Sequence, residues 1–228
     1  MPNILIGTSG FSYPEWKKVF YPEDLPSKNY LNYYAEHFKT TEINNTFYRL
    51  PSRKTTEGWY ANVPQDFSFT LKLTQKITHI RRLKGAHEEM NAFLEGAAGL
   101  MEKMGPILVQ LPPNFRKDVA VLEEFLCEYA KKGKLAFEFR HESWFSDDTY
   151  ELLKEHHCSL GVVEAEESAA VKEVTGPFIY MRLRKGDYTA EELASWANWI
   201  RSQKKDVYCY LKHDEKAPVL AKQLMEQL

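Results

Sequence analysis

The sequence predicts an α/β fold, a single-domain TIM-like (β/α)8 barrel in which residues 1–228 form one unit. Eight strand-like runs alternate with helical patterns along 228 residues, and a single barrel commonly fills that length. Such an alternation favours a closed parallel barrel over an open sheet. The first run ends in Gly7-Thr8-Ser9-Gly10, which lacks the Gly-x-Gly-x-x-Gly pattern of an open dinucleotide-binding sheet.

The predicted strands are short runs rich in β-branched, aromatic and other apolar residues. They cover residues 4–7, 42–48, 67–73, 107–111, 135–140, 160–164, 178–183 and 207–211.

Helical patterns are expected between most of these strands, at residues 29–38, 53–62, 86–104, 119–131 and 146–156. Ser146 followed by two aspartates is typical of a helix start. Thr189 with Glu192 forms a capping-box pattern, and Pro218 suits the first turn of a last helix. The sixth crossover, residues 166–177, is short and is expected to hold one helical turn.

Composition argues against several classes of protein. The net charge of −2 gives no global basic field that would recruit nucleic acid or an anionic membrane. No stretch approaches the ~18 apolar residues of a membrane span, and no signal-like run follows the start. The three cysteines form no Cys-x-x-Cys pair, which favours reduced thiols and a cytoplasmic protein without a membrane partner.

Side chains alternate between the two faces of a strand, so the residue parity along each strand predicts which side chains face the lumen and which face the helix layer. In the fifth strand Leu135, Phe137 and Phe139 share one face, and Glu138 and Arg140 share the other. The same rule directs a polar set into the lumen, mostly near the carboxyl ends of the strands: Glu42, Asn44, Thr70, Lys72, Gln110, Glu164, Tyr180, Arg182, Arg184, Tyr208, Tyr210 and Lys212.

Charges in a barrel lumen need a reason, because an unpaired buried charge costs several kcal/mol. The cations Lys72, Arg140, Arg182 and Lys212 roughly balance the anions Glu42, Glu138 and Glu164, so a purely structural network is one reading. Barrel active sites lie at the C-terminal ends of the strands. The sequence therefore favours a functional site at that mouth.

Several motifs in one order resemble the DUF72 (YecE-like) family nearly from end to end. They are residues 7–16 (GTSGFSYPEW), 41–49 (TEINNTFYR), Lys72 with 77–79 (ITH), 110–113 (QLPP), 138–144 (EFRHESW), Arg182-Leu183, and Tyr208 with Tyr210. The resemblance implies a TIM-like barrel with a polar cavity lined by Glu42, Asn44, Lys72, Gln110, Glu138 and Arg140.

The family is uncharacterised, so the resemblance implies little about activity. A likeness of such proteins to endonuclease-IV-type barrels implies nucleic acid as a candidate partner. The family's eighth strand usually ends Tyr-x-Phe-Asn-Asn, whereas Tyr210 is followed here by Leu211-Lys212-His213. The ligand or its protonation is therefore expected to differ in this chain.

Three kinds of chemistry suit these residues. Converging Lys and Arg side chains bind anions, and the segment 184–187 precedes a helix where barrels hold phosphate. General acid–base chemistry would use Glu42 or Glu164, with Glu138 kept ionised by Arg140, or a histidine among His79, His141 and His213. A divalent metal is the weakest alternative: Glu42, Glu138, Glu164, His141, His213 and Asp214 could supply ligands, but no His-x-His or His-Glu-x-x-His spacing occurs.

The leading hypothesis is an enzyme acting on a small anionic substrate, with no cofactor expected. Its predicted catalytic residues are Glu138, Glu42, Glu164, Lys72 and His141, and its predicted substrate-binding residues are Asn44, Gln110, Arg140, Arg182, Lys212, Tyr210, Trp144 and Tyr13. The alternatives are a nucleic-acid binding or processing protein and a non-catalytic ligand-binding barrel. The sequence makes no prediction of oligomeric state.

Overall fold

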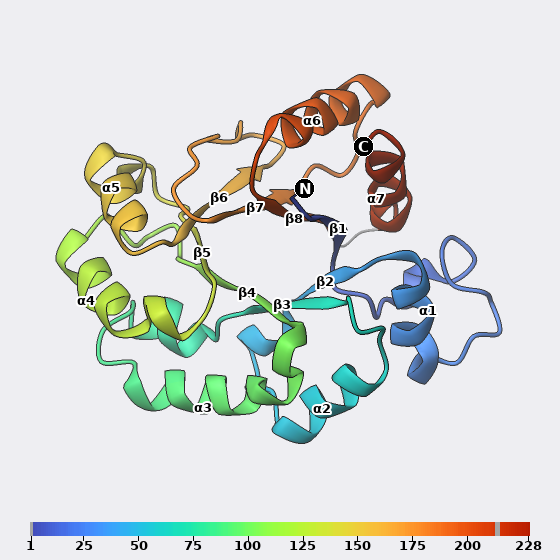
Figure 1. The fold of residues 1–228 in the computed structure, drawn as a ribbon, viewed down its shortest axis with the longest axis horizontal. Helices are drawn as coiled ribbons and strands as arrows, with labels where there is room; N and C mark the ends of the chain where they lie inside the picture. Colours follow the sequence, from blue (N-terminus) through green and yellow to red (C-terminus); the bar gives the residue numbers. More distant parts are fainter. Residues whose placement is uncertain (1, 213–214) are drawn as a thin grey trace.

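The computed structural model describes residues 2–212 and 215–228. Within them, eight parallel strands pair in chain order and close into a barrel through β8 and β1 (Figure 1). This confirms the predicted TIM-like barrel. The strands are β1 Ile4–Ser9, β2 Thr40–Ile43, β3 Ser68–Lys72, β4 Met104–Gln110, β5 Leu135–Glu138, β6 Ser159–Glu164, β7 Phe178–Leu183 and β8 Asp206–Leu211.

α-Helices surround the barrel and cover the outer face of its strands (Figure 1). They are α1 Tyr30–His37, α2 Arg53–Ala61, α3 His87–Ala97, α4 Val119–Tyr129, α5 Asp147–Glu155, α6 Ala190–Ser202 and α7 Ala217–Glu226. The sixth crossover, between β6 and β7, is short as predicted, but the expected helical turn is wrong. Residues 165–177 form a loop with one isolated bridge between Ala165 and Ser168.

The helix starts follow their caps. Thr189 accepts a hydrogen bond from the backbone N–H of Glu192, whose side chain accepts one from Thr189 N–H, so the predicted capping box is confirmed. Pro218 stands in the first turn of α7 as predicted. Ser146 precedes α5, but its hydroxyl donates to Asp148 instead of capping the helix.

Two predicted segments end early. The second strand stops at Ile43, and Asn45–Phe47 form a 3-10 turn that the Thr46 hydroxyl fastens to the carbonyls of Ile43 and Lys72. The aromatic residues after it had suggested a longer strand. The predicted helix 86–104 leaves α-helical geometry after Ala97, and Met101 takes a positive φ of 49° before β4 begins.

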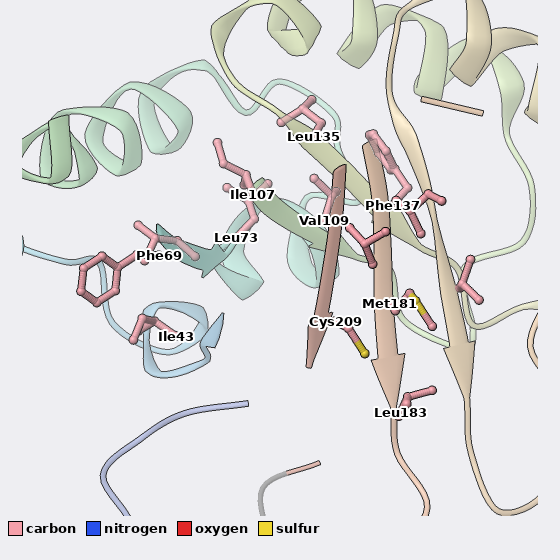
Figure 2. Packing of buried hydrophobic residues seen from close by; sticks show 14 of the residues in the cluster. Ile43, Phe69, Leu73, Ile107, Val109, Leu135, Phe137, Met181, Leu183 and Cys209 are labelled. Carbon is pink, nitrogen blue, oxygen red and sulfur yellow. The ribbon is translucent and has the colours of Figure 1, made fainter. Parts of the chain in front are cut away.

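The main hydrophobic core lies between the barrel and its helices. Figure 2 shows part of it, with Phe69, Val109, Phe137 and Met181 projecting from β3, β4, β5 and β7. These side chains occupy the outer face that residue parity predicts for Phe69 and Phe137. The alternation leaves their neighbours in the chain to fill the lumen.

A second, separate cluster fills the lumen. It consists of Leu108, Ala136, Phe178, Tyr180, Tyr208 and Tyr210, with Leu5 packed against it. The Tyr210 hydroxyl is 2.7 Å from the hydroxyl oxygens of both Thr40 and Thr70. The six residues of this cluster are at most 5% exposed. This aromatic layer fills the lumen, so a site is expected at the C-terminal mouth, where barrel active sites lie.

Among the described residues, no helix has both the length and the apolar character needed to cross a bilayer.

Candidate functional site

Arg182 on β7 stands at the centre of the mouth. Its Nη1 donates to Oε2 of Glu138 at 2.6 Å, and its Nη2 donates to Oε1 of Glu42 at 2.8 Å. The Arg182 side chain is 3% exposed, and the two carboxylates are 0% and 2% exposed. The guanidinium of Arg182, on β7, therefore links the carboxylate of Glu42 on β2 to that of Glu138 on β5. All three side chains face the lumen, as the alternation of residues along the strands predicts.

Both carboxylate oxygens of Glu42 accept hydrogen bonds. Ser9 and Asn44 donate to Oε1 at 2.9 and 2.8 Å, and the Tyr180 hydroxyl donates to Oε2. Burial alone would raise the pKa of Glu42, but Arg182 and these hydrogen bonds outweigh burial and hold the pKa below its ordinary value. Glu42 is therefore an ionised acceptor.

Glu138 is equally well satisfied. Gln110 Nε2 donates to its Oε1 at 2.6 Å, and Arg140 Nε donates to the same oxygen at 2.9 Å. Burial raises the pKa of Glu138, but Arg182 and then Arg140 bring it down to about 2. The structure thus brings the predicted Gln110 and Arg140 onto the carboxylate of Glu138.

Lys72, at the end of β3, is a cation of the mouth whose described contact is with an aromatic ring. Its Nζ lies 4.2 Å from the centroid of the Phe47 ring. No hydrogen bond or ion pair joins its ammonium to another described residue. Burial, followed by the positive charge of Arg182, lowers the pKa of Lys72 to about 8. The ammonium is half-buried at the mouth and titrates close to neutral pH.

Arg184 follows β7, and its guanidinium also has no hydrogen bond or ion pair within residues 2–212 and 215–228. Burial and the charge of Arg182 lower its pKa. Arg184 lines a cavity of about 560 Å³ together with Glu138 and Arg140. Four cations, from Lys72, Arg140, Arg182 and Arg184, thus share the mouth with two carboxylates, Glu42 and Glu138. This excess of positive charge suits an anionic ligand.

The predicted lumen position of Glu164 is wrong. Its carboxylate accepts a hydrogen bond from Trp196 Nε1 of α6 at 3.0 Å and lies 3.6 Å from Lys185 Nζ. Gly161, Val163 and Ala165 line the cavity instead. β6 is apolar on both faces before Glu164, so the pattern did not reveal its parity.

Two predicted binding residues are buried away from any ligand. Trp144 is 0% exposed, stacks on Phe139 at 4.7 Å between centroids and donates to the carbonyl of Phe115. Tyr210 faces the lumen as predicted but is also 0% exposed, in the layer below the site. Both rings pack in the core in this structure, so neither presents a surface to a ligand, and their predicted contact with a ligand stays a prediction.

Tyr13 lies at the mouth. Its hydroxyl donates to the carbonyl of Ser9 at 2.8 Å, and its ring helps to line a second cavity, of about 370 Å³, with Asn44. Burial, with the charges of Glu42 and Glu15, raises the pKa of Tyr13 to about 12. The phenol is therefore held neutral beside the site.

The predicted histidines are less central. His141 Nδ1 accepts from the backbone N–H of Ser143 at 3.1 Å, within a local turn. His79 packs against Phe47, and burial, Lys72 and Arg140 lower its pKa. Lys212 is half-buried, and its backbone N–H donates to Leu183 as β8 ends. His213 and Asp214 lie outside the described residues.

Within the part of the chain that the structure describes, no three His, Cys, Asp or Glu side chains gather in an arrangement that could hold a metal ion. The donor set at the mouth is instead two carboxylates already engaged by arginines.

Three further contributors were absent from the predicted site residues. The alternation of residues along β7 assigned Tyr180 and Arg184 correctly to the lumen, so this pattern could have identified both as site residues. Ser9, which donates to Glu42, lies in a motif chosen for its glycines. Its proximity to Glu42 depends on the pairing of β1 with β2, where Ser9 is directly opposite Glu42.

Comparisons with known proteins agree on one family. The model of the family described as "Protein of unknown function DUF72" matches residues 5–228. Two curated relatives, each named UPF0759 protein YecE, come from Escherichia coli K12 and O157:H7 and are 28% identical over 144 residues. That match takes 63% of this chain and 50% of each relative, so the chain spans about half the length of the curated relatives it matches.

Solved structures extend the likeness to the whole fold. A DUF72 family protein from Thermotoga maritima has a TM-score of 0.85 at 28% identity, and the match covers 98% of both chains. A DUF72 family protein from Enterococcus faecalis has a TM-score of 0.80 at 22% identity, covering 99% of this chain and 95% of that one. The second likeness shows the fold alone.

Proposed function

This chain belongs to the DUF72 family of proteins of unknown function, and we propose that it is an enzyme that binds a small carboxylate or phosphate at the barrel mouth and acts on it by proton transfer. The observation that carries the proposal is the charge imbalance there. Lys72, Arg140 and Arg184 interact electrostatically with a carboxylate pair that Arg182 already neutralises in part. A bound anion would neutralise the remaining positive charge.

The proposal gives different roles to the two carboxylates and the lysine. Glu42 and Glu138 have depressed pKa values and accept three or more hydrogen bonds each, so they hold Arg182 in place and are poor proton donors near neutral pH. Lys72 has a pKa of about 8. A group with that pKa exists in both protonation states near neutral pH, as a general acid or base requires.

The first experiment is a thermal-shift screen with inorganic phosphate, sulfate, small carboxylates and phosphate monoesters. Binding is expected to raise the melting temperature, and Arg184→Met is expected to weaken it by at least about tenfold. Arg53→Met, at an exposed pair with Glu57, is the matched control. If no anion shifts the melting temperature, or if both variants respond alike, the proposal is wrong.

Catalysis is tested on a small carboxylate or phosphate monoester that binds and that has hydrogens on the carbon next to the anionic group. Its carbon-bound hydrogens would be followed by NMR in deuterated water, where proton transfer replaces them with deuterium. The wild type is expected to exchange and Lys72→Met is not. Binding without exchange in the wild type would favour the non-catalytic ligand-binding barrel.

Nucleic acid is a second candidate because the rim beside the mouth is basic. A cavity of about 510 Å³ between the loops after β3 and β4 is lined by Arg81, Arg82, Lys84, Arg116 and Lys117, with Asn114, Phe115 and Asp118. Arg81, Lys84 and Lys117 pair with Glu89, Asp118 and Asp148. In the described residues Arg82 and Arg116 have no such ion pair.

A further inference from the structure

The 560 Å³ cavity at the mouth has two chemically different sides. Its charged side is formed by Glu138, Arg140 and Arg184. The rest of its wall is almost wholly apolar: Pro113, Phe139, Phe145, Gly161, Val163, Ala165, Ala169 and Val171, with Ser168. Its volume is within the range of small-molecule sites. The anion-binding groups therefore open onto an apolar wall.

The charged side has unused donors. Arg140 gives its Nε to Glu138, but its Nη atoms have no hydrogen bond to a described residue. Arg184 gives none of its donors to a described residue; burial, and after it the charges of Arg182 and Arg140, lower its pKa. An anion between Arg140 and Arg184 would relieve their repulsion and accept from both planar groups.

The apolar side follows from the irregular sixth crossover. Because residues 165–177 form no helix, the chain turns at the bridge between Ala165 and Ser168, and Ala165, Ala169 and Val171 line the cavity. Gly161 keeps the wall open where β6 passes β5, since a Cβ there would come within 3.2 Å of the Phe137 carbonyl. The crossover thus supplies a wall of small apolar side chains.

Phe145 shows that this wall is incomplete. This residue lines the cavity and is 38% exposed, although its ring contacts Phe139 edge-on. A polar ligand such as a sugar phosphate would find few hydrogen-bonding side chains on this side, since Ser168 is the polar residue of the crossover wall. An apolar group would instead bury exposed carbon.

We infer that the site selects an amphipathic anion, a carboxylate or phosphate monoester joined to an apolar group about the size of one ring, with the anion between Arg140 and Arg184 and the apolar group against Phe145 and Val163. This inference rests on the proposed function and specifies its substrate class.

The test compares matched probes by isothermal titration calorimetry on the full chain. Phenyl phosphate is set against inorganic phosphate, phenylacetate against acetate, and benzyl alcohol supplies the ring without charge. Comparison of the phosphate pair with the carboxylate pair shows which of the two anions the site prefers. Each ring-bearing anion is expected to bind at least about tenfold more tightly than its ring-free partner, because it buries apolar surface.

Two variants locate the effect. Phe145→Ala and Val163→Thr are expected to reduce the advantage of the ring severalfold and to leave the affinity for inorganic phosphate unchanged. Val219→Thr, at a 40%-exposed position of α7, is the matched control. Arg184→Met is expected to weaken both members of each pair. Circular dichroism confirms that the variants fold.

The outcomes separate the inference from the proposed function. If ring-bearing and ring-free anions bind equally and Arg184→Met weakens both, the proposed function stands and the inference is wrong. If benzyl alcohol binds as tightly as phenyl phosphate, the anion is not selected and both are wrong. If none of the anions binds, both are wrong.

Discussion

Arg182 Nη1 lies 2.6 Å from Oε2 of Glu138, and both side chains are at most 3% exposed. With Glu42 on its other Nη, this arginine compensates two buried carboxylates at once. Its Nε is buried without a hydrogen-bond partner in the described residues. A cluster with this much buried charge is a costly way to fill a barrel, because apolar side chains of similar volume are often as stable.

Replacing Arg182 by Met should therefore be severe. The variant leaves two buried carboxylates without their shared cation, and we expect a loss of about 3–5 kcal/mol in the free energy of unfolding. Urea denaturation followed by circular dichroism measures it. The control Arg53→Met breaks an exposed pair and should cost less than about 1 kcal/mol.

The triple variant Glu42→Gln, Glu138→Gln, Arg182→Met removes all three charges together. If the cluster is kept for ligand binding, this variant should regain much of the stability that Arg182→Met loses. It should still bind phosphate more weakly than the wild type, although Lys72, Arg140 and Arg184 keep their charge, because Glu138 no longer holds Arg140 in place. A triple variant that still binds phosphate as the wild type does would contradict a functional role for the cluster.

Acid should destabilise the protein through Glu138. Its pKa is about 2 in the folded chain, below its ordinary value of 4.5, so the unfolded chain binds more protons between these values. The stabilisation, about 3 kcal/mol, is complete above pH 4.5 and is lost as the pH falls towards 2. Urea denaturation from pH 6 to pH 2 should show a shallower slope for Glu138→Gln, whereas Glu124→Gln, at an exposed site on α4, should keep the wild-type slope.

Lys72 should make anion binding pH-dependent. Its pKa is about 8, so its ammonium loses its charge as the pH rises through that value, and affinity should then fall by up to about tenfold per pH unit. Sulfate is the suitable probe because its own charge is constant over the range. Lys72→Arg keeps the charge and should remove the inflection near pH 8; an unchanged inflection in that variant would assign it to another group.

The same lowered pKa predicts the opposite effect on stability. The unfolded chain holds the Lys72 proton up to its ordinary pKa of 10.5, so between about 8 and 10.5 it binds more protons than the folded chain. Stability should therefore rise with pH across that window. Lys72→Met should lack this rise and be at least as stable as the wild type at neutral pH. A clear loss of stability in Lys72→Met would indicate a structural role.

Glu164 should matter little to ligand binding. It lies outside the lumen, against Trp196 and Lys185. In Glu164→Gln the side-chain oxygen still accepts from Trp196, so we expect a stability loss of about 1 kcal/mol or less. Phosphate affinity should stay within about twofold of the wild type, whereas Arg184→Met should lower it by at least about tenfold; equal losses in the two variants would place Glu164 in the site after all.

The sequence predicted the barrel and the core of the site because the clearest strands alternate strongly. In β5, Glu138 stands between Phe137 and Phe139, and in β7, Arg182 stands between Met181 and Leu183. In these strands the alternation therefore places the charged side chain on one face and the apolar side chains on the other. β6 offers no such contrast, since Val162 and Val163 are apolar on both faces, and Glu164 was assigned to the wrong one.

The sequence also did not predict how deep in the lumen each inward-facing side chain lies. Parity placed Tyr210 and Arg182 on the same inner face, but it does not distinguish the sealed aromatic layer from the mouth above it. The strand register does not make that distinction either, because Tyr210 is directly opposite Arg182. The distinction follows from where each long side chain ends, at Thr40 and Thr70 for Tyr210 and at the two carboxylates for Arg182. The register does decide the contact between Ser9 and Glu42. Trp144 ends a 3-10 helix of three residues, Glu142–Trp144, which is too short to show a periodic pattern, and its burial against Phe139 follows from tertiary packing.

The basic rim gives a prediction that separates the two candidate functions. If nucleic acid is the ligand, fluorescence anisotropy should detect binding of single-stranded or duplex oligonucleotides at low salt, with an affinity that falls steeply as salt rises. The double variant Arg82→Ala, Arg116→Ala should flatten that dependence by nearly two in the slope of log K against log salt. Lys131→Ala with Lys204→Ala is the control, because both exposed lysines precede strands, β5 and β8, at the opposite end of the barrel. If no oligonucleotide binds even at low ionic strength, the nucleic-acid candidate is wrong, and the small-anion enzyme and the non-catalytic ligand-binding barrel remain.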